Sequence, residues 1–192
     1  MGKEIRAFYG QESALRGLAF SPDSQWLVSV GEGHSLKLWE VSSGRSLADF
    51  HGHESITSCV AFSPDGRLVA SGGLDGAVKL WSATRRAPLT LTGFDGGVCG
   101  LEFLPDSRRL VSGAGWFSTR GRLQIWDATT AEPLAPTFER CPEVYEVALH
   151  PDGRRLATAQ QGSDYGSWGR GGLGPRDRPA RMGTGGTSGL GR

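Results

Sequence analysis

Three side chains of the types that form a hydrolytic triad, His53, Ser71 and Asp75, lie within one short stretch of the chain. In such a triad the serine attacks, the histidine accepts its proton and the aspartate orients the histidine. Ser71, however, falls in the middle of a strand-like run and not on the sharp strand-to-helix turn that exposes a nucleophile. The sequence therefore predicts a structural role for these residues, and we expect no enzymatic activity.

Other residues with reactive or ligating side chains show no spacing typical of a metal or cofactor site. The cysteines and the remaining histidines are scattered along the chain, at Cys59, Cys99, Cys141, His34, His51 and His150. The glycines match turns, and the sequence contains no phosphate-loop signature. We therefore expect no metal and no cofactor, and we interpret the cysteines as free core thiols of a reducing compartment.

The elements that must position these side chains are short antiparallel strands. Within residues 52–81, turn residues separate three apolar runs, at 56–62, 68–71 and 78–81. The first turn, Ser-Pro-Asp-Gly, has a proline that presets φ and a glycine that accepts a positive φ. The second contains Asp-Gly, a strong hairpin signal. A unit of three such strands cannot bury both of its faces, so it requires neighbours.

The chain supplies these neighbours, because the same pattern recurs along it. A turn proline and a strand-ending tryptophan return about every 42 residues, at Pro22, Pro64, Pro105 and Pro151 and at Trp39, Trp81 and Trp126. A period of this length is typical of propeller arrays. The pairs Trp39-Glu40, Trp81-Ser82 and Trp126-Asp127 resemble the Trp-Asp of the WD-repeat (WD40) family, over about residues 3–160. The resemblance implies an all-β fold, a β-propeller of about four four-stranded antiparallel blades in an incomplete ring.

The recurrence divides the chain into a WD40 region, residues 1–168, and a tail. The predicted parts of the WD40 region are an outer strand at 3–9, repeat 1 (10–51), repeat 2 (52–92), repeat 3 (93–138) and a partial repeat 4 (139–168). Trp168 follows Thr158 at the interval that separates Ser29 from Trp39, so it is either a degraded strand end or a coincidence. Residues 169–192 are rich in glycine and arginine and lack aromatic residues, so we expect a disordered tail.

In the WD40 family an aspartate, a histidine, a serine or threonine and the tryptophan form a hydrogen-bonded set that links three strands. The resemblance assigns these roles in repeat 2, where we expect a structural tetrad of His53, Ser71, Asp75 and Trp81. The other repeats carry Gln11, Phe94 and Arg140 at the histidine position and Gly33, Arg120 and Gly162 at the aspartate position. We therefore expect the complete set in repeat 2 alone.

One irregular hairpin, residues 113–122 of repeat 3, is the candidate partner-binding element. In WD40 propellers this hairpin and the loop that leads into each repeat share the face that usually binds partners. The hairpin carries residue types common in interface hot spots, namely Trp116, Phe117, Arg120 and Arg122. Alternatively, its two aromatic side chains pack back over the blade. Further candidates on the same face are Glu54, Phe94, Asp95 and Tyr145.

Charge and hydropathy argue against several other classes of protein. The net charge is +1 at pH 7, so no global field favours nucleic acid or a membrane surface as a partner. No apolar run is long enough for a transmembrane helix, and the first residues do not resemble a signal peptide. We therefore expect a cytoplasmic protein.

These observations predict a non-enzymatic scaffold for protein–protein interactions, with a protein or peptide partner of unknown identity. Two alternatives stay open: a truncated propeller with no independent activity, or the sensor part of a larger regulatory protein whose catalytic domain lies elsewhere. The arrangement of the blades also stays open. The chain is a fragment of a longer array, a closed four-blade ring, or a homodimer in which each copy's first strand completes the other copy's last blade.

Overall fold

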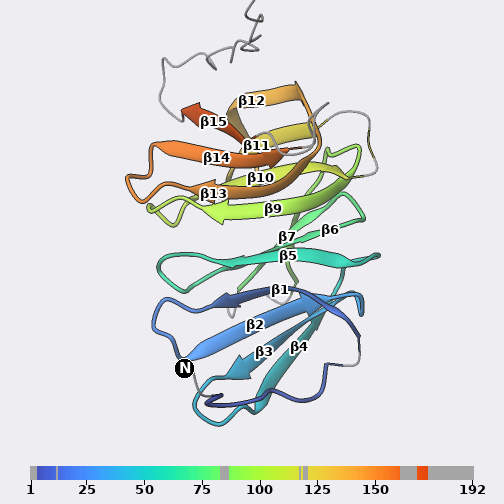
Figure 1. Ribbon diagram of the computed structural model, residues 1–192, viewed down its shortest axis with the longest axis vertical. Coiled ribbons are helices and arrows are strands. Elements are labelled where there is room, and N and C mark those ends of the chain that lie inside the picture. The colour runs from blue at the N-terminus through green and yellow to red at the C-terminus, as the bar shows by residue number, and fades with distance from the viewer. Residues whose placement is uncertain are drawn as a thin grey trace, which may run out of the picture.

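The computed structural model describes residues 4–11, 13–82, 87–116, 118, 121–160 and 168–172, and these residues form strands and turns without any helix. The strands make four antiparallel sheets, which we call blades 1 to 4 in chain order (Figure 1). Blade 1 consists of β1 (Leu15–Phe20), β2 (Trp26–Gly31), β3 (Ser35–Glu40) and β4 (Ser46–His51). Blade 2 consists of β5 (Thr57–Phe62), β6 (Val69–Gly73), β7 (Val78–Trp81) and β8 (Leu89–Leu91). Blade 3 consists of β9 (Gly97–Phe103), β10 (Arg109–Trp116), β11 (Gly121–Asp127) and β12 (Pro133–Cys141). Blade 4 consists of β13 (Val144–Leu149), β14 (Arg155–Gln160) and β15 (Trp168–Gly172).

The turn between the first two strands of each blade has a local chemical cause. In blade 2 the Ser63 hydroxyl donates to Asp65 Oδ1 (2.7 Å), and the same oxygen accepts a backbone amide two residues further on (3.1 Å). Gly66 closes the turn with a φ of 72°, in the left-handed region that glycine tolerates. The equivalent residues of blades 1 and 3, Ser24 and Ser107, adopt the same region with φ of 59° and 58°. The Pro-Asp pair therefore produces this turn even without glycine.

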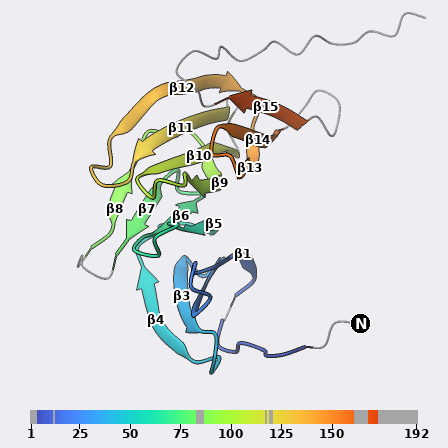
Figure 2. The same ribbon diagram turned by 90° about the vertical axis from the view of Figure 1, so that its left-hand side faces the viewer.

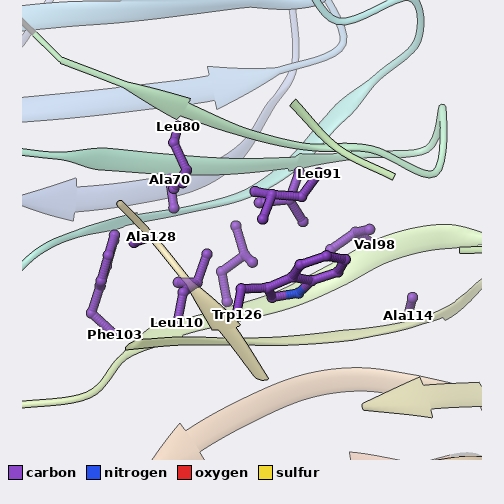
Figure 3. Packing of buried hydrophobic residues seen from close by; sticks show 11 residues of the cluster. Ala70, Leu80, Leu91, Val98, Phe103, Leu110, Ala114, Trp126 and Ala128 are labelled. Carbon is purple, nitrogen blue, oxygen red and sulfur yellow. The ribbon is translucent and has the colours of Figure 1, made fainter. Parts of the chain in front are cut away.

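The blades bury their sheet faces against one another. We call the face of a blade toward the preceding blade its leading face, and the opposite face its trailing face. In the largest cluster (Figure 3), Leu80 and Leu91 of blade 2 pack with Leu110 and Trp126 of blade 3. Equivalent clusters join blades 1 and 2 and blades 3 and 4. The core is therefore a series of apolar layers, each between two consecutive blades.

The four blades form an open arc (Figure 2), as the repeat pattern predicts for an incomplete propeller. The first strand of each blade lies along the concave side of the arc, and β4, β8 and β12 lie along its convex side. Blades 1 to 3 have four strands each. Blade 4 has three within the described residues, in the order β13-β14-β15, so its third strand has an unpaired outer edge there.

The segment at the start of the chain differs from the prediction. Its described part, residues 4–9 of the predicted outer strand 3–9, is not a strand. A strand requires a neighbouring edge with which to exchange hydrogen bonds, and this segment adjoins no such edge within the described residues. It lies instead against blade 1, where the ring centroids of Phe8 and Trp39 are 5.9 Å apart.

The last described strand distinguishes between the two interpretations of Trp168. Trp168 begins β15 and pairs with Ala159, whereas Trp39 in blade 1 pairs with Leu27. The Leu27 position of blade 4 is Leu156, so Trp168 is not equivalent to Trp39. The interval between Trp168 and the preceding strand is therefore a coincidence, because the connection between β14 and β15 is longer than in blade 1.

The predicted tail begins within a strand. Its first residues, 169–172, belong to β15, since their backbone pairs with β14. The rest of the predicted tail, residues 173–192, lies outside the described residues. Among the residues that the structure describes, no helix is long and apolar enough to cross a membrane.

Candidate functional site

One chain of hydrogen bonds in blade 2 links β6, β7, the hairpin between them and the loop that leads into the blade. The indole N–H of Trp81 donates to Ser71 Oγ (2.8 Å), and this oxygen lies 2.8 Å from His53 Nε2. The other ring nitrogen, His53 Nδ1, lies 2.9 Å from Asp75 Oδ2. The Asp75 carboxylate can only accept, so His53 Nδ1 carries the proton and donates to it. In the neutral ring Nε2 is then the acceptor of the Ser71 hydroxyl. The structure therefore places the four residues of the expected tetrad in a single network.

Burial and the carboxylate set the electrostatics of this network. Ser71 is 0% and His53 only 6% exposed. Burial lowers the pKa of His53 below its ordinary value, although Asp75 opposes the shift. Burial raises the pKa of Asp75, but the Glu54 amide (2.9 Å) and His53 outweigh it, so the Asp75 pKa lies below its usual range. The network is thus a neutral imidazole next to an ionised carboxylate.

The order of groups matches that of a Ser-His-Asp triad, yet the serine is not placed to attack a substrate. Ser71 Oγ is bonded on one side by Trp81 and on the other by His53, and Ser71 exposes no surface. A serine nucleophile needs an accessible oxygen and room for a reacting carbonyl beside oxyanion donors. These residues therefore join the strands of the blade.

Blades 1 and 3 keep the bond between the tryptophan and a hydroxyl and replace the rest of the network. In blade 1, Trp39 Nε1 donates to Ser29 Oγ (2.8 Å), and that hydroxyl donates to Gln11 Oε1 (3.0 Å). In blade 3, Trp126 Nε1 donates to Ser112 Oγ (2.7 Å). A glutamine amide thus accepts the bond that His53 accepts in blade 2.

An aromatic stack takes the place of the histidine in blade 3. The rings of Phe94 and Trp126 are 5.7 Å apart at 60°, an edge-to-face arrangement. The Arg122 guanidinium lies over the Phe94 ring, 5.9 Å from its centroid, and donates to the carbonyl of Gly93. Phe94 and Arg122, predicted to contact a partner, therefore pack within blade 3.

The other described candidates lie on the loops and strand ends at one edge of blades 2 to 4. Trp116 ends β10 and is half-buried, whereas Tyr145 in β13 is 39% exposed. The Tyr145 hydroxyl donates to Glu143 (2.9 Å). Glu54 and Asp95 are exposed. Two candidates lie outside the described residues, Phe117 and Arg120.

Two glycines let the β10–β11 hairpin approach its neighbours closely. A Cβ at Gly115 would lie 3.1 Å from the Cα of Glu143, the residue directly before β13 of blade 4, and Gly115 has a φ of 142°. A Cβ at Gly96 would lie 2.7 Å from the Ser118 Cβ and 2.9 Å from the Trp116 carbonyl oxygen. Residues other than glycine would therefore displace the hairpin. Neither glycine was singled out from the sequence. Both lie outside the recurring turns, and this was the signal that could have indicated a close approach.

The concave side of the arc has a hollow of about 390 Å³ lined by residues of the first strands. Burial raises the pKa values of Glu102 and Glu146, and the Glu146 charge raises that of Glu102 further. Burial, with Glu146 and Glu143 nearby, raises the pKa of the Cys99 thiol to about 12. A protonated thiol is a poor nucleophile and metal ligand. Within the described part of the chain, no group of three or more histidine, cysteine or acidic residues is arranged to hold a metal ion.

Comparison with known proteins gives matches over most of the repeats. The family model "WD domain, G-beta repeat" matches residues 2–40, 44–82 and 86–127. A human relative, WD repeat-containing protein 36, is 38% identical over 42 residues, which cover 22% of this chain and 5% of that protein. The solved RRP9 WD40 repeats superpose with a TM-score of 0.71 at 27% identity, over 81% of this chain and 47% of that chain. The computationally designed Ika4 protein superposes with a TM-score of 0.72 at 26% identity, over 91% of this chain and 100% of that chain. This chain thus spans a small part of the human relative and about half of the RRP9 repeats.

Proposed function

Because the chain belongs to the WD40 repeat family, we propose that it is a non-enzymatic scaffold that binds a protein or peptide on the loop face of blades 2 to 4. We define this loop face by Trp116, Tyr145, Glu143, Glu54 and Asp95. WD40 repeats imply a role in protein interactions, and the choice of this particular face is our proposal. It invokes neither nucleic acid nor a membrane as partner.

The observation that carries the proposal is the presentation of two aromatic side chains from a fixed backbone. Trp116 stands on a hairpin held within contact distance of blade 4 at Gly115, and Tyr145 stands on β13 with its hydroxyl bonded to Glu143. Aromatic residues supply a large part of the binding energy at interfaces. A surface that is already ordered loses little conformational entropy on binding, which favours affinity.

The charges on the loop face indicate what kind of partner suits it. Exposed carboxylates at Glu54 and Asp95 lie on the loops that lead into blades 2 and 3, and Glu143 lies beside Tyr145. Carboxylates next to aromatic rings favour a partner segment that carries arginine or lysine among apolar residues. Such a segment gains an ion pair and a ring contact at the same place.

A capture experiment with the full chain tests this proposal. Wild-type protein and the double variant Trp116→Ala, Tyr145→Ala are used as bait, with Trp26→Ala as control. Trp26 is a suitable control because it is 37% exposed and lies at the start of β2, next to the turn between β1 and β2. We expect partners that bind the wild type and the control but not the double variant. Equal capture by all three proteins would refute the choice of face. The absence of any partner would favour a propeller segment without independent activity.

The cellular compartment is part of the same proposal. Cys59 and Cys99 are free thiols although both lie on first strands of neighbouring blades, and free thiols are typical of reducing compartments such as the cytoplasm. Fluorescence microscopy of the tagged full chain tests this assignment, and a signal confined to a secretory compartment would refute it.

A further inference from the structure

The leading face of blade 1 has no blade against it among the described residues, and it exposes apolar side chains at positions that are buried or half-buried in the other blades. Leu15 is 49% exposed, whereas its equivalents Thr57, Val98 and Val144 are each 0% exposed. Leu18 is 58% exposed, whereas its equivalents in blades 3 and 4 are 5% and 2% exposed. In those blades the trailing face of the preceding blade covers these positions. The internal repeat thus shows that a blade's trailing face fits this surface.

Phe20 shows the same contrast at the end of β1. It is 60% exposed, whereas its equivalent in blade 3, Phe103, is 4% exposed and packs in the cluster between blades 2 and 3. Three apolar side chains of one strand, at Leu15, Leu18 and Phe20, therefore form a continuous apolar edge on the concave half of the leading face. Exposed apolar patches of this kind mark interaction sites.

The convex half of the same face is already covered, by the segment 4–9. The Phe8 ring lies 5.9 Å from Trp39, and the equivalent contact in blade 2 is that of Phe50 with Trp81, at 5.7 Å. Phe50 belongs to β4, the fourth strand of the preceding blade. The segment 4–9 therefore occupies the place of a fourth strand, and the described residues provide no inner strands of a preceding blade beside it.

Blade 4, at the other end of the arc, has the complementary set of strands. Its described strands are three inner strands, β13-β14-β15, and its outer edge at β15 is unpaired within the described residues. Its trailing face carries Ala157 and Ala159 at the positions of Val28 and Val30, which in blade 1 pack against blade 2. Within the described residues, no inner strands of another blade lie against blade 1, and blade 4 has three inner strands without a fourth.

We propose that two copies of this chain associate through these ends. The trailing face of blade 4 in each copy covers Leu15, Leu18 and Phe20 of the other copy, and residues 4–9 of that other copy pair with β15 as its fourth strand. The two contacts are identical, so the assembly has two-fold symmetry and closes with two copies. Strand pairing of this kind removes the open edge of β15. The surfaces differ from the loop face of the proposed function, so either proposal stands or fails alone.

The mass of the full chain in solution, measured by light scattering over a range of concentrations, tests the association. We expect twice the chain mass of 20.5 kDa. Leu18→Asp and Phe20→Asp each place a charge in the apolar contact and should weaken the dimer about 100-fold or more. Leu47→Asp is the matched control, because Leu47 is 42% exposed on β4, outside both proposed contacts, and should leave the dimer unchanged.

Several outcomes would overturn the proposal. These are a monomer at all concentrations, a series of species that grows with concentration, or a dimer that survives both substitutions on β1. Circular dichroism of the variants establishes that any monomer is folded. A second measurement addresses the strand: the amides of residues 4–9 should exchange slowly with solvent in the wild type and rapidly in Phe20→Asp. Rapid exchange in a wild-type dimer would refute the strand exchange. The double variant at Trp116 and Tyr145 should keep the dimer mass.

Discussion

Replacing Ser71 with alanine should destabilise the chain more than the same change at Ser112, its equivalent in blade 3. Both serines are 0% exposed, and each accepts an indole N–H, at 2.8 Å and 2.7 Å. Ser71 also bonds a second buried group, His53 Nε2, at 2.8 Å, whereas the other bond of Ser112 is a 3.4 Å contact with a backbone carbonyl. Each buried polar group left unsatisfied costs about 1–3 kcal/mol. The loss in the free energy of unfolding should therefore be roughly twice as large for Ser71→Ala.

Urea unfolding of the two variants and the wild type measures this difference, and hydrogen exchange of the amides in β6 and β10 locates it. A difference of about 1 kcal/mol corresponds to about 2–4 °C in the melting temperature of a chain of this size. Ser71→Thr is the control, because Thr158 occupies the same position in blade 4, and it should restore most of the stability. Equal losses for the two alanine variants would refute the view that the histidine adds a second bond.

Three further predictions concern acid, the aromatic stack and the thiols. Because the pKa values of His53 and Asp75 are lowered in the fold, each stabilises the protein above its ordinary pKa. Urea midpoints should therefore fall as the pH drops below 6.5 and again below 3.8, and Asp75→Asn should flatten the second fall. Phe94→Ala should cost about 1–3 kcal/mol of unfolding free energy, because it removes the edge-to-face contact with Trp126. Cys99 should resist alkylation in the native protein at neutral pH and react after unfolding, as mass spectrometry of peptides would show.

The turns and short strands were predictable because their causes are local. Ser63, Asp65 and Gly66 make a turn from contacts between residues close in sequence, so a pattern read along the chain contains the whole cause. The period of the pattern then predicts that each unit needs neighbours, and the layers between blades show how the neighbours cover it.

Features that depend on distant edges were not predictable in this way. Residues 4–9 have the sequence of an outer strand, but a strand needs an edge that only another blade provides. Trp168 lies at the expected interval but in another register, because the length of a connection changes the pairing. Phe94 and Arg122 belong to residue types common at interfaces, and only the fold shows that they face Trp126 and the Phe94 ring, respectively.

The unequal size of the apolar layers has a consequence for how the chain opens. Counting described residues, the buried cluster between blades 2 and 3 has 11 members, that between blades 3 and 4 has seven, and that between blades 1 and 2 has four. In a linear array of repeats, cooperativity comes from coupling between nearest neighbours. We therefore expect blades 2 and 3 to be the most strongly coupled pair, and blade 1 to open at a lower free-energy cost than blades 2 and 3. Blade 1 has the largest exposed apolar edge and is also the blade most weakly coupled to its neighbour. A contact made at this edge would therefore extend the cooperative unit to blade 1.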